Sequence, residues 1–147
     1  MKRVGLHFPR WAKLTLYGNL LLSLATGMTW FALHRWGQVE GEFGMEPHPA
    51  EPWLLRIHGA SAFLILIGFG YLLATHLTVG WRSRRNRPLG LSLVVCLALL
   101  AASGYLLYYA SGEGFRDTVS WVHFIIGLSF PVILASHVIV GHRRSKK

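Results

Sequence analysis

The chain has 147 residues, of which 52% are hydrophobic and only 14% are charged. Soluble domains carry about 25% charged residues, so this composition excludes an ordinary water-soluble domain and indicates lipid as the main solvent. The formal net charge is +9, but the basic residues flank apolar stretches instead of alternating with aromatic residues, which excludes nucleic acid as a partner.

Four apolar stretches follow one another along the chain, over approximately residues 14–34, 53–77, 89–110 and 118–140. A helix of roughly 20 apolar residues crosses the hydrocarbon core of a bilayer, so each stretch predicts one membrane-spanning helix. The first stretch follows basic residues, as in a signal peptide, but its apolar run is longer, and we expect an uncleaved helix. The predicted fold class is all-α: a single four-helix transmembrane bundle over residues 1–147, surrounded by membrane lipid.

Charged residues separate between the two ends of this predicted bundle. Twelve of the 15 basic residues precede the first span, join the second to the third, or follow the fourth: Lys2, Arg3, Arg10, Lys13, Arg82, Arg84, Arg85, Arg87, Arg143, Arg144, Lys146 and Lys147. All six acidic residues lie in the other two connections: Glu40, Glu42, Glu46, Glu51, Glu113 and Asp117. By the positive-inside rule, both termini are expected in the cytoplasm.

Four of the eight histidines lie inside the second and fourth predicted spans, His58 and His76 in the second and His123 and His137 in the fourth, and His34 is the last residue of the first span. Ionisable side chains are costly in lipid, so they usually face the interior of a bundle and mark a functional site. His58 and His76 are 18 residues apart, which is five whole helical turns, and His123 and His137 are 14 apart, which leaves a rotation of about 40°. Each helix is therefore expected to present both imidazoles on one side.

The order of the spans pairs His58 with His123 near the outer side, and His76 with His137 near the cytoplasmic side. Two imidazoles on opposite sides of a porphyrin are the axial ligands of an electron-transfer haem, and neutral imidazole adds no charge in lipid. The pattern therefore predicts two non-covalent b haems with bis-histidine ligation. At 1.5 Å per residue the histidines are about 27 Å apart on the second span and about 21 Å on the fourth. Either different tilts of the two helices or a local kink near Gly68 and Gly70 is expected to absorb this difference of roughly one turn.

Other interpretations of the spans remain. The histidines are alternatively hydrogen-bonded core residues, and a metal-ion transporter is disfavoured because the spans lack Asp and Glu partners. Cys96 is the only cysteine, which excludes disulfides, cysteine-rich metal sites and covalent haem attachment. Glycines on the spans either make room for a macrocycle or allow close helix packing. His34 is a reserve outer ligand, whereas His7, His48 and His142 are expected to be solvated or interfacial.

The segment Trp121-Val122-His123-Phe124, followed by His137, resembles the last haem-binding helix of bacterial dihaem b-type cytochromes, the membrane subunits of hydrogenases and formate dehydrogenases. Phe8-Pro9-Arg10-Trp11 also resembles the approach to the first helix of that family. The resemblance implies electron transfer in the bacterial inner membrane, with a quinone and a periplasmic cytochrome or dehydrogenase subunit as partners. The family's ligand near the start of the first helix is missing from Leu16-Tyr17-Gly18, and His76 is expected to replace it.

Basic residues near the expected haem edges are candidates for binding propionates. They are Arg56 and Arg35 for the outer haem, and Arg82, Arg84 or Lys13 for the inner one; the alternative for the inner group is lipid head groups. The acidic segments, residues 40–51 and 112–117, are candidates for docking a redox partner. We expect an electron-transfer subunit, with a stand-alone quinone oxidoreductase and a haem-free assembly subunit as alternatives.

Overall fold

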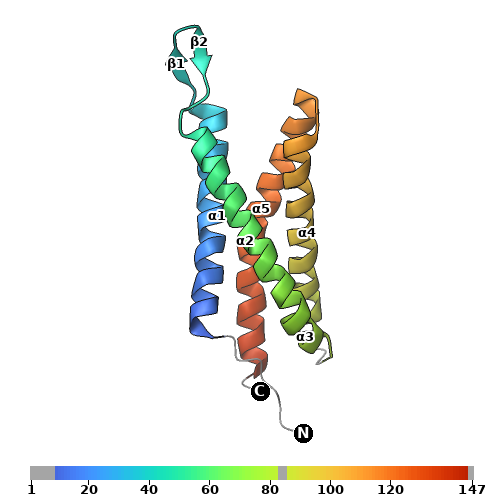
Figure 1. Ribbon diagram of the computed structural model, residues 1–147. Coiled ribbons are helices and arrows are strands. Elements are labelled where there is room, and N and C mark those ends of the chain that lie inside the picture. The colour runs from blue at the N-terminus through green and yellow to red at the C-terminus, as the bar shows by residue number, and fades with distance from the viewer. Residues whose placement is uncertain (1–8, 83–85, 146–147) are drawn as a thin grey trace. The chain divides into compact units, whose positions relative to one another are not determined.

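The computed structural model describes residues 9–82 and 86–145 and consists almost entirely of long helices (Figure 1). In chain order the elements are α1 (Arg10–Trp36), β1 (Val39–Gly41), β2 (Gly44–Glu46), α2 (Glu51–Leu72), a π-helical turn η1 (Leu73–Leu77), α3 (Thr78–Arg82), α4 (Arg87–Tyr109) and α5 (Glu113–Ser145). Within the described residues, four stretches are long and apolar enough to cross a membrane: Arg10–Trp36, Glu51–Arg82, Arg87–Tyr109 and Glu113–Arg143. The prediction of four membrane-spanning helices is confirmed, and the chain is a multi-pass membrane protein.

The helices extend beyond the apolar stretches that predicted them. Helix α1 begins at Arg10, and the second span continues through η1 and α3 to Arg82. Hydropathy detects only the part of a helix that lies in hydrocarbon, whereas backbone hydrogen bonding continues into the interface. Pro52 and Pro88 lie in the first turns of α2 and α4, where a missing N–H leaves no helical hydrogen bond unmade.

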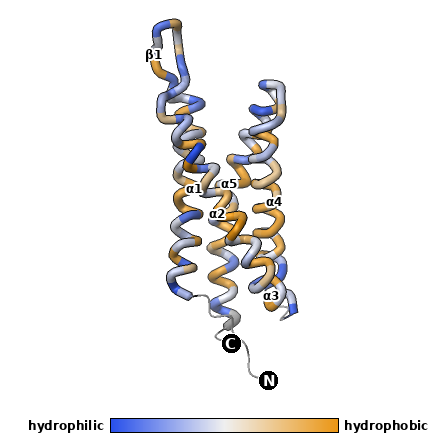
Figure 2. The backbone as a smooth tube through the Cα atoms, in the orientation of Figure 1, coloured by the Kyte–Doolittle hydropathy of each residue, from blue (hydrophilic) through white to orange (hydrophobic). Residues whose placement is uncertain are grey.

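A small β-hairpin between α1 and α2 was not predicted. Its antiparallel strands pair Val39 with Glu46 and Gly41 with Gly44, and Gly44 has a φ of +123°, which glycine adopts without strain. The hairpin and the helix ends carry hydrophilic residues, whereas α4 is hydrophobic over most of its length (Figure 2). This distribution is the one expected of helices whose middles lie in lipid.

The chain divides into two compact units, Met1–His76 and Leu77–Lys147. In unit 1, α1 packs against α2 with the β-hairpin at their connection, and in unit 2, α4 packs against α5. Each unit is therefore an antiparallel helical hairpin. That the chain forms one bundle with both termini in the cytoplasm stays a prediction. Lys2, Arg3, Arg84, Arg85, Lys146 and Lys147, which contributed to the charge pattern, lie outside the described residues.

Small polar residues hold the helices of unit 1 together. Ser61 on α2 is only 2% exposed, and its hydroxyl donates to the Asn19 carbonyl oxygen of α1 at 3.3 Å. The Asn19 amide returns a hydrogen bond to the Ser61 carbonyl oxygen at 2.9 Å. Association of helices in lipid depends on such close packing and interhelical hydrogen bonds because apolar side chains gain little from leaving an apolar solvent.

Replacement of Ser61 by leucine is expected to destabilise unit 1 by roughly 1–3 kcal/mol, because the contact has no space for a larger side chain. Thermal unfolding in detergent measures the effect. Ser61→Ala removes only one hydroxyl hydrogen bond and is the control, with an expected loss of about 1 kcal/mol or less. Equal unfolding temperatures for S61L and S61A would contradict the packing described for this position.

Candidate functional site

The imidazole of His58 on α2 is bound to one turn of α1. Its Nδ1 atom lies 2.9 Å from the Ser23 carbonyl oxygen and 3.4 Å from the Thr26 hydroxyl. A carbonyl oxygen only accepts hydrogen bonds, so Nδ1 must carry the proton. The neutral ring then has its lone pair on Nε2, the nitrogen through which imidazole binds a metal in this tautomer.

Gly27 makes the close approach of this ring to α1 possible. A Cβ atom at Gly27 would lie 2.9 Å from Cε1 and 3.1 Å from Nδ1 of His58, which is closer than real side-chain contacts allow. From the sequence, the glycines on the spans either make room for a macrocycle or allow close helix packing. At Gly27 the missing side chain makes room for the imidazole itself.

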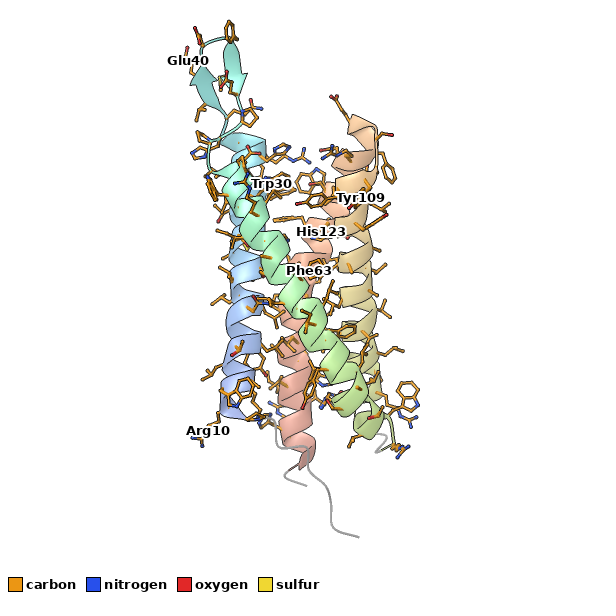
Figure 3. The ribbon with its side chains drawn as sticks, in the orientation of Figure 1. Arg10, Trp30, Glu40, Phe63, Tyr109 and His123 are labelled. Carbon is orange, nitrogen blue, oxygen red and sulfur yellow. The ribbon has the colours of Figure 1, made fainter. Side chains whose placement is uncertain are left out.

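His123 on α5 has an equivalent environment in unit 2 (Figure 3). Its Nδ1 lies 2.8 Å from the hydroxyl of Ser103 on α4, and that hydroxyl donates to the Leu99 carbonyl oxygen at 2.7 Å. Because the single hydroxyl proton is directed to Leu99, the Ser103 oxygen accepts from His123 Nδ1. A Cβ atom at Gly104 would lie 3.5 Å from His123 Cε1, so this glycine also faces the ring.

The two environments reveal an internal repeat that the sequence analysis missed. Ala25-Thr26-Gly27 on α1 corresponds to Ala102-Ser103-Gly104 on α4, and in each case the hydroxyl and the glycine face a histidine of the next helix. A second pair of segments, at the ends of the histidine-bearing spans, reads Thr75-His76-Leu77-Thr78-Val79-Gly80 and Ser136-His137-Val138-Ile139-Val140-Gly141. These shared small residues are the feature of the sequence from which the repeat could have been recognised. The two hairpins are therefore similar in sequence as well as in form.

At His137 the hydrogen bond to Nδ1 has the opposite direction, because the ring nitrogen accepts it. Asn86, the 8%-exposed residue before α4, donates from its Nδ2 to the His137 carbonyl oxygen at 3.0 Å and lies 3.3 Å from His137 Nδ1. An amide nitrogen can only donate, so Nδ1 accepts and the proton of the neutral ring is on Nε2. Asn86 has a φ of +53°, a conformation that asparagine tolerates better than most residues. A Cβ atom at Gly90 would lie 3.5 Å from Cε1 of His137, so a glycine faces this ring as well.

His76 lies in the π-helical turn η1 and is exposed. A π turn holds one more residue than an α turn, so straight α-helical counting from His58 does not give the face on which His76 lies. This π turn, at Leu73–Leu77, was not predicted, and Gly68 and Gly70 lie within the α-helical α2. Absorption of the offset by different tilts or by a kink stays a prediction. The ligand roles of His58, His76, His123 and His137, and the two pairings, stay predictions.

His34, the reserve ligand, lies near the C-terminal end of α1 and has a carboxylate partner at the start of α2. Its Nδ1 lies 2.9 Å from Glu51 Oε2, and its ring stacks on Trp30 with centroids 4.6 Å apart. Glu51 also accepts from the His48 backbone N–H at 3.2 Å. His142 binds the Val138 carbonyl oxygen of its own helix, and His7 lies outside the described residues.

The predicted propionate-binding residues differ in their surroundings. The guanidinium of Arg56 lies 4.7 Å from the centroid of the Trp53 ring, and that of Arg35 lies 5.3 Å from the centroid of Phe31. Lys13 and Arg82 are exposed on α1 and α3, and Arg84 lies outside the described residues. None of these contacts tests a role in binding propionate, so that assignment stays a prediction.

Trp30 has a property that fits an acidic ligand near the C-terminal end of α1. Its indole nitrogen Nε1 is buried and, among the described residues, has no hydrogen-bond acceptor. It follows Gly27 by three residues, so it lies on the same side of α1, one turn closer to the C-terminal end of that helix. A buried N–H donor without an acceptor is costly, and a carboxylate such as a haem propionate would satisfy it.

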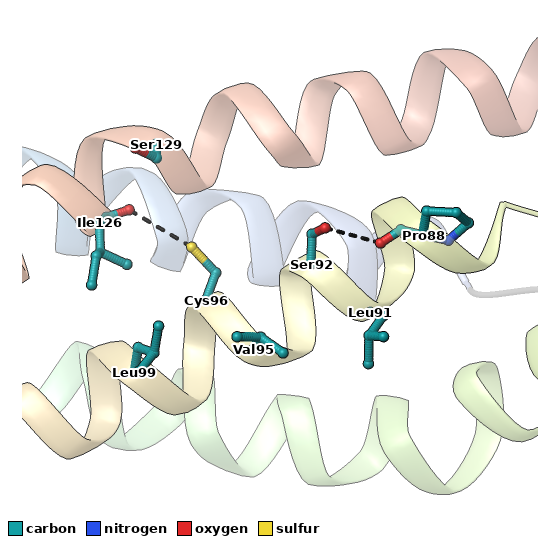
Figure 4. A pocket seen from close by; sticks show the side chains of 8 residues that line it. All are labelled: Pro88, Leu91, Ser92, Val95, Cys96, Leu99, Ile126 and Ser129. Carbon is teal, nitrogen blue, oxygen red and sulfur yellow. Dashed lines mark hydrogen bonds between the residues drawn. The ribbon is translucent and has the colours of Figure 1, made fainter.

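An open groove of about 520 Å³ runs along unit 2 (Figure 4), lined by Pro88, Leu91, Ser92, Val95, Cys96, Leu99, Ile126 and Ser129. The Ser92 and Ser129 hydroxyls bind carbonyl oxygens of their own helices, at 2.9 and 2.8 Å. The groove therefore offers mainly apolar contacts, and we do not assign the candidate site to it.

No protein-family model, curated protein or solved structure matches this chain. Within residues 9–82 and 86–145, no group of three or more His, Cys, Asp or Glu side chains is arranged to hold a metal ion. A bis-histidine haem requires only two protein ligands, so the relevant chemistry is the paired imidazole environment.

Gly27→Ala is expected to displace the His58 ring and break its hydrogen bond to Ser23, with a loss of stability of roughly 1–3 kcal/mol. The matched control is Gly104→Ala, whose added methyl group would make an ordinary contact at 3.5 Å. Thermal unfolding of both variants in detergent tests the difference. If G104A lost as much stability as G27A, the special closeness at His58 would be refuted.

Proposed function

We propose that this chain is a membrane electron-transfer subunit that binds b-type haem through His58 and His123. The observation that supports the proposal best is the equivalence of the two histidine environments. In each hairpin a hydroxyl-glycine pair on the first helix faces a histidine of the second, and hydrogen bonding keeps Nδ1 protonated. Metal-binding histidines in proteins usually donate their second N–H in this way.

The internal repeat supports the pairing of these two histidines. Both helices that carry them run from an acidic connection towards a basic segment, so the positive-inside rule predicts the same direction for both in a membrane. Hairpins of similar sequence with the same predicted direction are expected to carry equivalent residues at similar depth. His58 and His123 are then suitable as the two axial ligands of one haem near the outer surface.

When bound, haem supplies one-electron transfer between ferric and ferrous iron. The chain's own residues hold the ligand rings, and the apolar helices exclude water. Trp30, Arg35 and Arg56 are the candidates for the propionates of this outer haem. His76 and His137, with Arg82 or Lys13, are the candidates for an inner haem, which would extend electron transfer across the bilayer.

The partners proposed are the quinone pool of the bacterial inner membrane and a periplasmic cytochrome or dehydrogenase subunit. The exposed glutamates of the β-hairpin, Glu40, Glu42 and Glu46, provide a negatively charged surface for such a partner. Glu51 is not part of this surface, because it is 7% exposed and bound to His34. Charge complementarity of this kind accelerates association more than it tightens binding.

The purified chain is expected to show the reduced-minus-oxidised absorption bands of b haem. His58→Ala and His123→Ala are each expected to remove the same haem, because each takes away one of its two axial ligands. The double variant should then lose no more haem than either single variant. Haem content per chain is the measurement, and His142→Ala is the control because His142 binds only a carbonyl oxygen of its own helix in the contacts described.

Absence of any b-type haem band would contradict this function and favour the haem-free assembly subunit. Loss of different haems in H58A and H123A would contradict the pairing but not haem binding.

A stand-alone quinone oxidoreductase differs from an electron-transfer subunit in needing no second protein. Addition of a quinol to the purified chain, followed by a small diffusible oxidant, separates the two. We expect turnover to require a partner subunit, and sustained turnover by the chain alone would favour the oxidoreductase.

A further inference from the structure

We propose that the residue hydrogen-bonded to Nδ1 decides the order in which the histidine sites accept haem: the His58 and His123 site is ready for iron, whereas Asn86 keeps His137 from binding iron until its amide turns. The inference rests on the proposed haem-binding function. It adds the roles of Ser103, Thr26 and Asn86 as positioning residues.

The tautomers of His58 and His123 are determined by groups that can only accept a hydrogen bond from the ring. The Ser23 carbonyl oxygen can only accept, and the Ser103 hydroxyl directs its proton to Leu99. Thr26 similarly donates to the Leu22 carbonyl oxygen at 2.7 Å. With three such groups around two rings, Nδ1 is the protonated nitrogen of both His58 and His123, and Nε2 holds the lone pair that iron requires.

Asn86 has the opposite effect on His137. Its Nδ2 donates to both the carbonyl oxygen and Nδ1 of that residue, so the proton of the neutral ring is on Nε2. A neutral imidazole protonated on Nε2 cannot bind iron through that atom. Ligation by His137 Nε2 therefore requires the amide to turn, so that Oδ1 accepts from Nδ1–H.

This rotation has a definite structural consequence. It removes the donor from the His137 carbonyl oxygen and brings the amide oxygen towards it. Asn86 is buried and precedes the first turn of α4, so the lost hydrogen bond is not replaced easily by water. Haem binding at His137 should therefore be weaker than at the outer site, although both sites use imidazole.

Two substitutions at Asn86 separate the direction of the hydrogen bond from the loss of the amide. Asn86→Asp places an acceptor beside Nδ1, whereas Asn86→Gly places nothing there. Both residues tolerate the positive φ of this position, and both variants lose the donor to the His137 carbonyl oxygen. The difference between them thus reports the carboxylate beside Nδ1, which supplies an acceptor together with its negative charge.

The experiment measures binding of added haem, by Soret absorbance, to protein produced without haem and held in detergent. A His58→Ala background removes the outer site so that the inner site is observed by itself. In this background N86D is expected to bind haem roughly 10- to 100-fold more tightly than the unsubstituted Asn86, the range typical of outer-shell partners of metal ligands, with N86G between them. His137→Ala should abolish the gain.

The outer site is tested in a His137→Ala background. There Ser103→Ala is expected to weaken haem binding by roughly 10- to 100-fold, and Ser103→Thr, which keeps the hydroxyl, should retain it. Unfolding temperatures of the haem-free variants identify any that fail to fold.

The proposal is overturned if N86D in the H58A background binds haem no more tightly than the unsubstituted Asn86, or if S103A leaves the outer affinity unchanged. Failure of the proposed function has a different result: the unsubstituted protein would then bind no haem specifically at either site.

Discussion

A histidine inside a bilayer must satisfy its polar nitrogens within the protein, and the rest of this structure depends on that constraint. Hydrocarbon offers no hydrogen-bond partner, so the imidazoles of His58 and His123 bind groups on the neighbouring helix, and that of His137 binds Asn86, the residue before α4. At His58 the ring approaches α1 so closely that Gly27 cannot carry a side chain, whereas at His123 a Cβ atom at Gly104 would make an ordinary contact at 3.5 Å. Each glycine directly follows a hydroxyl-bearing residue. The helix contacts and the candidate ligands are therefore parts of one arrangement.

The same constraint is met by hydrogen bonds of opposite direction at the two ends of the hairpins. At His58 and His123 the partner accepts a hydrogen bond from the ring, whereas at His137 the partner donates one. An imidazole can take either arrangement at similar cost in lipid, but only the first leaves Nε2 suited to iron. Stability alone does not require the acceptor at both outer histidines. Its occurrence in both hairpins is what connects the packing of this protein to the proposed electron transfer.

The four spans were predictable because a helix that crosses hydrocarbon needs a long apolar stretch. Such a stretch can be recognised in a single sequence, without knowledge of which residues are in contact. The candidate histidines were also predictable, because ionisable residues are rare within apolar stretches and stand out in the sequence. Their hydrogen-bond partners were not, because the approach of Ser103 to His123 depends on how two helices pack. The π turn around His76 and the β-hairpin also escaped prediction. Hydropathy does not distinguish an α turn from a π turn, and the hairpin is too short to show a clear alternation.

The central proposal is that the imidazoles of His58 and His123 bind one haem iron. Electron paramagnetic resonance of the oxidised, purified protein tests it most directly, because the signal reports the axial ligands of the ferric iron. The account predicts a low-spin ferric signal of bis-imidazole type, unchanged when external imidazole is added because no coordination position is open. A high-spin signal that becomes low-spin on addition of imidazole would show a missing ligand and would contradict the account.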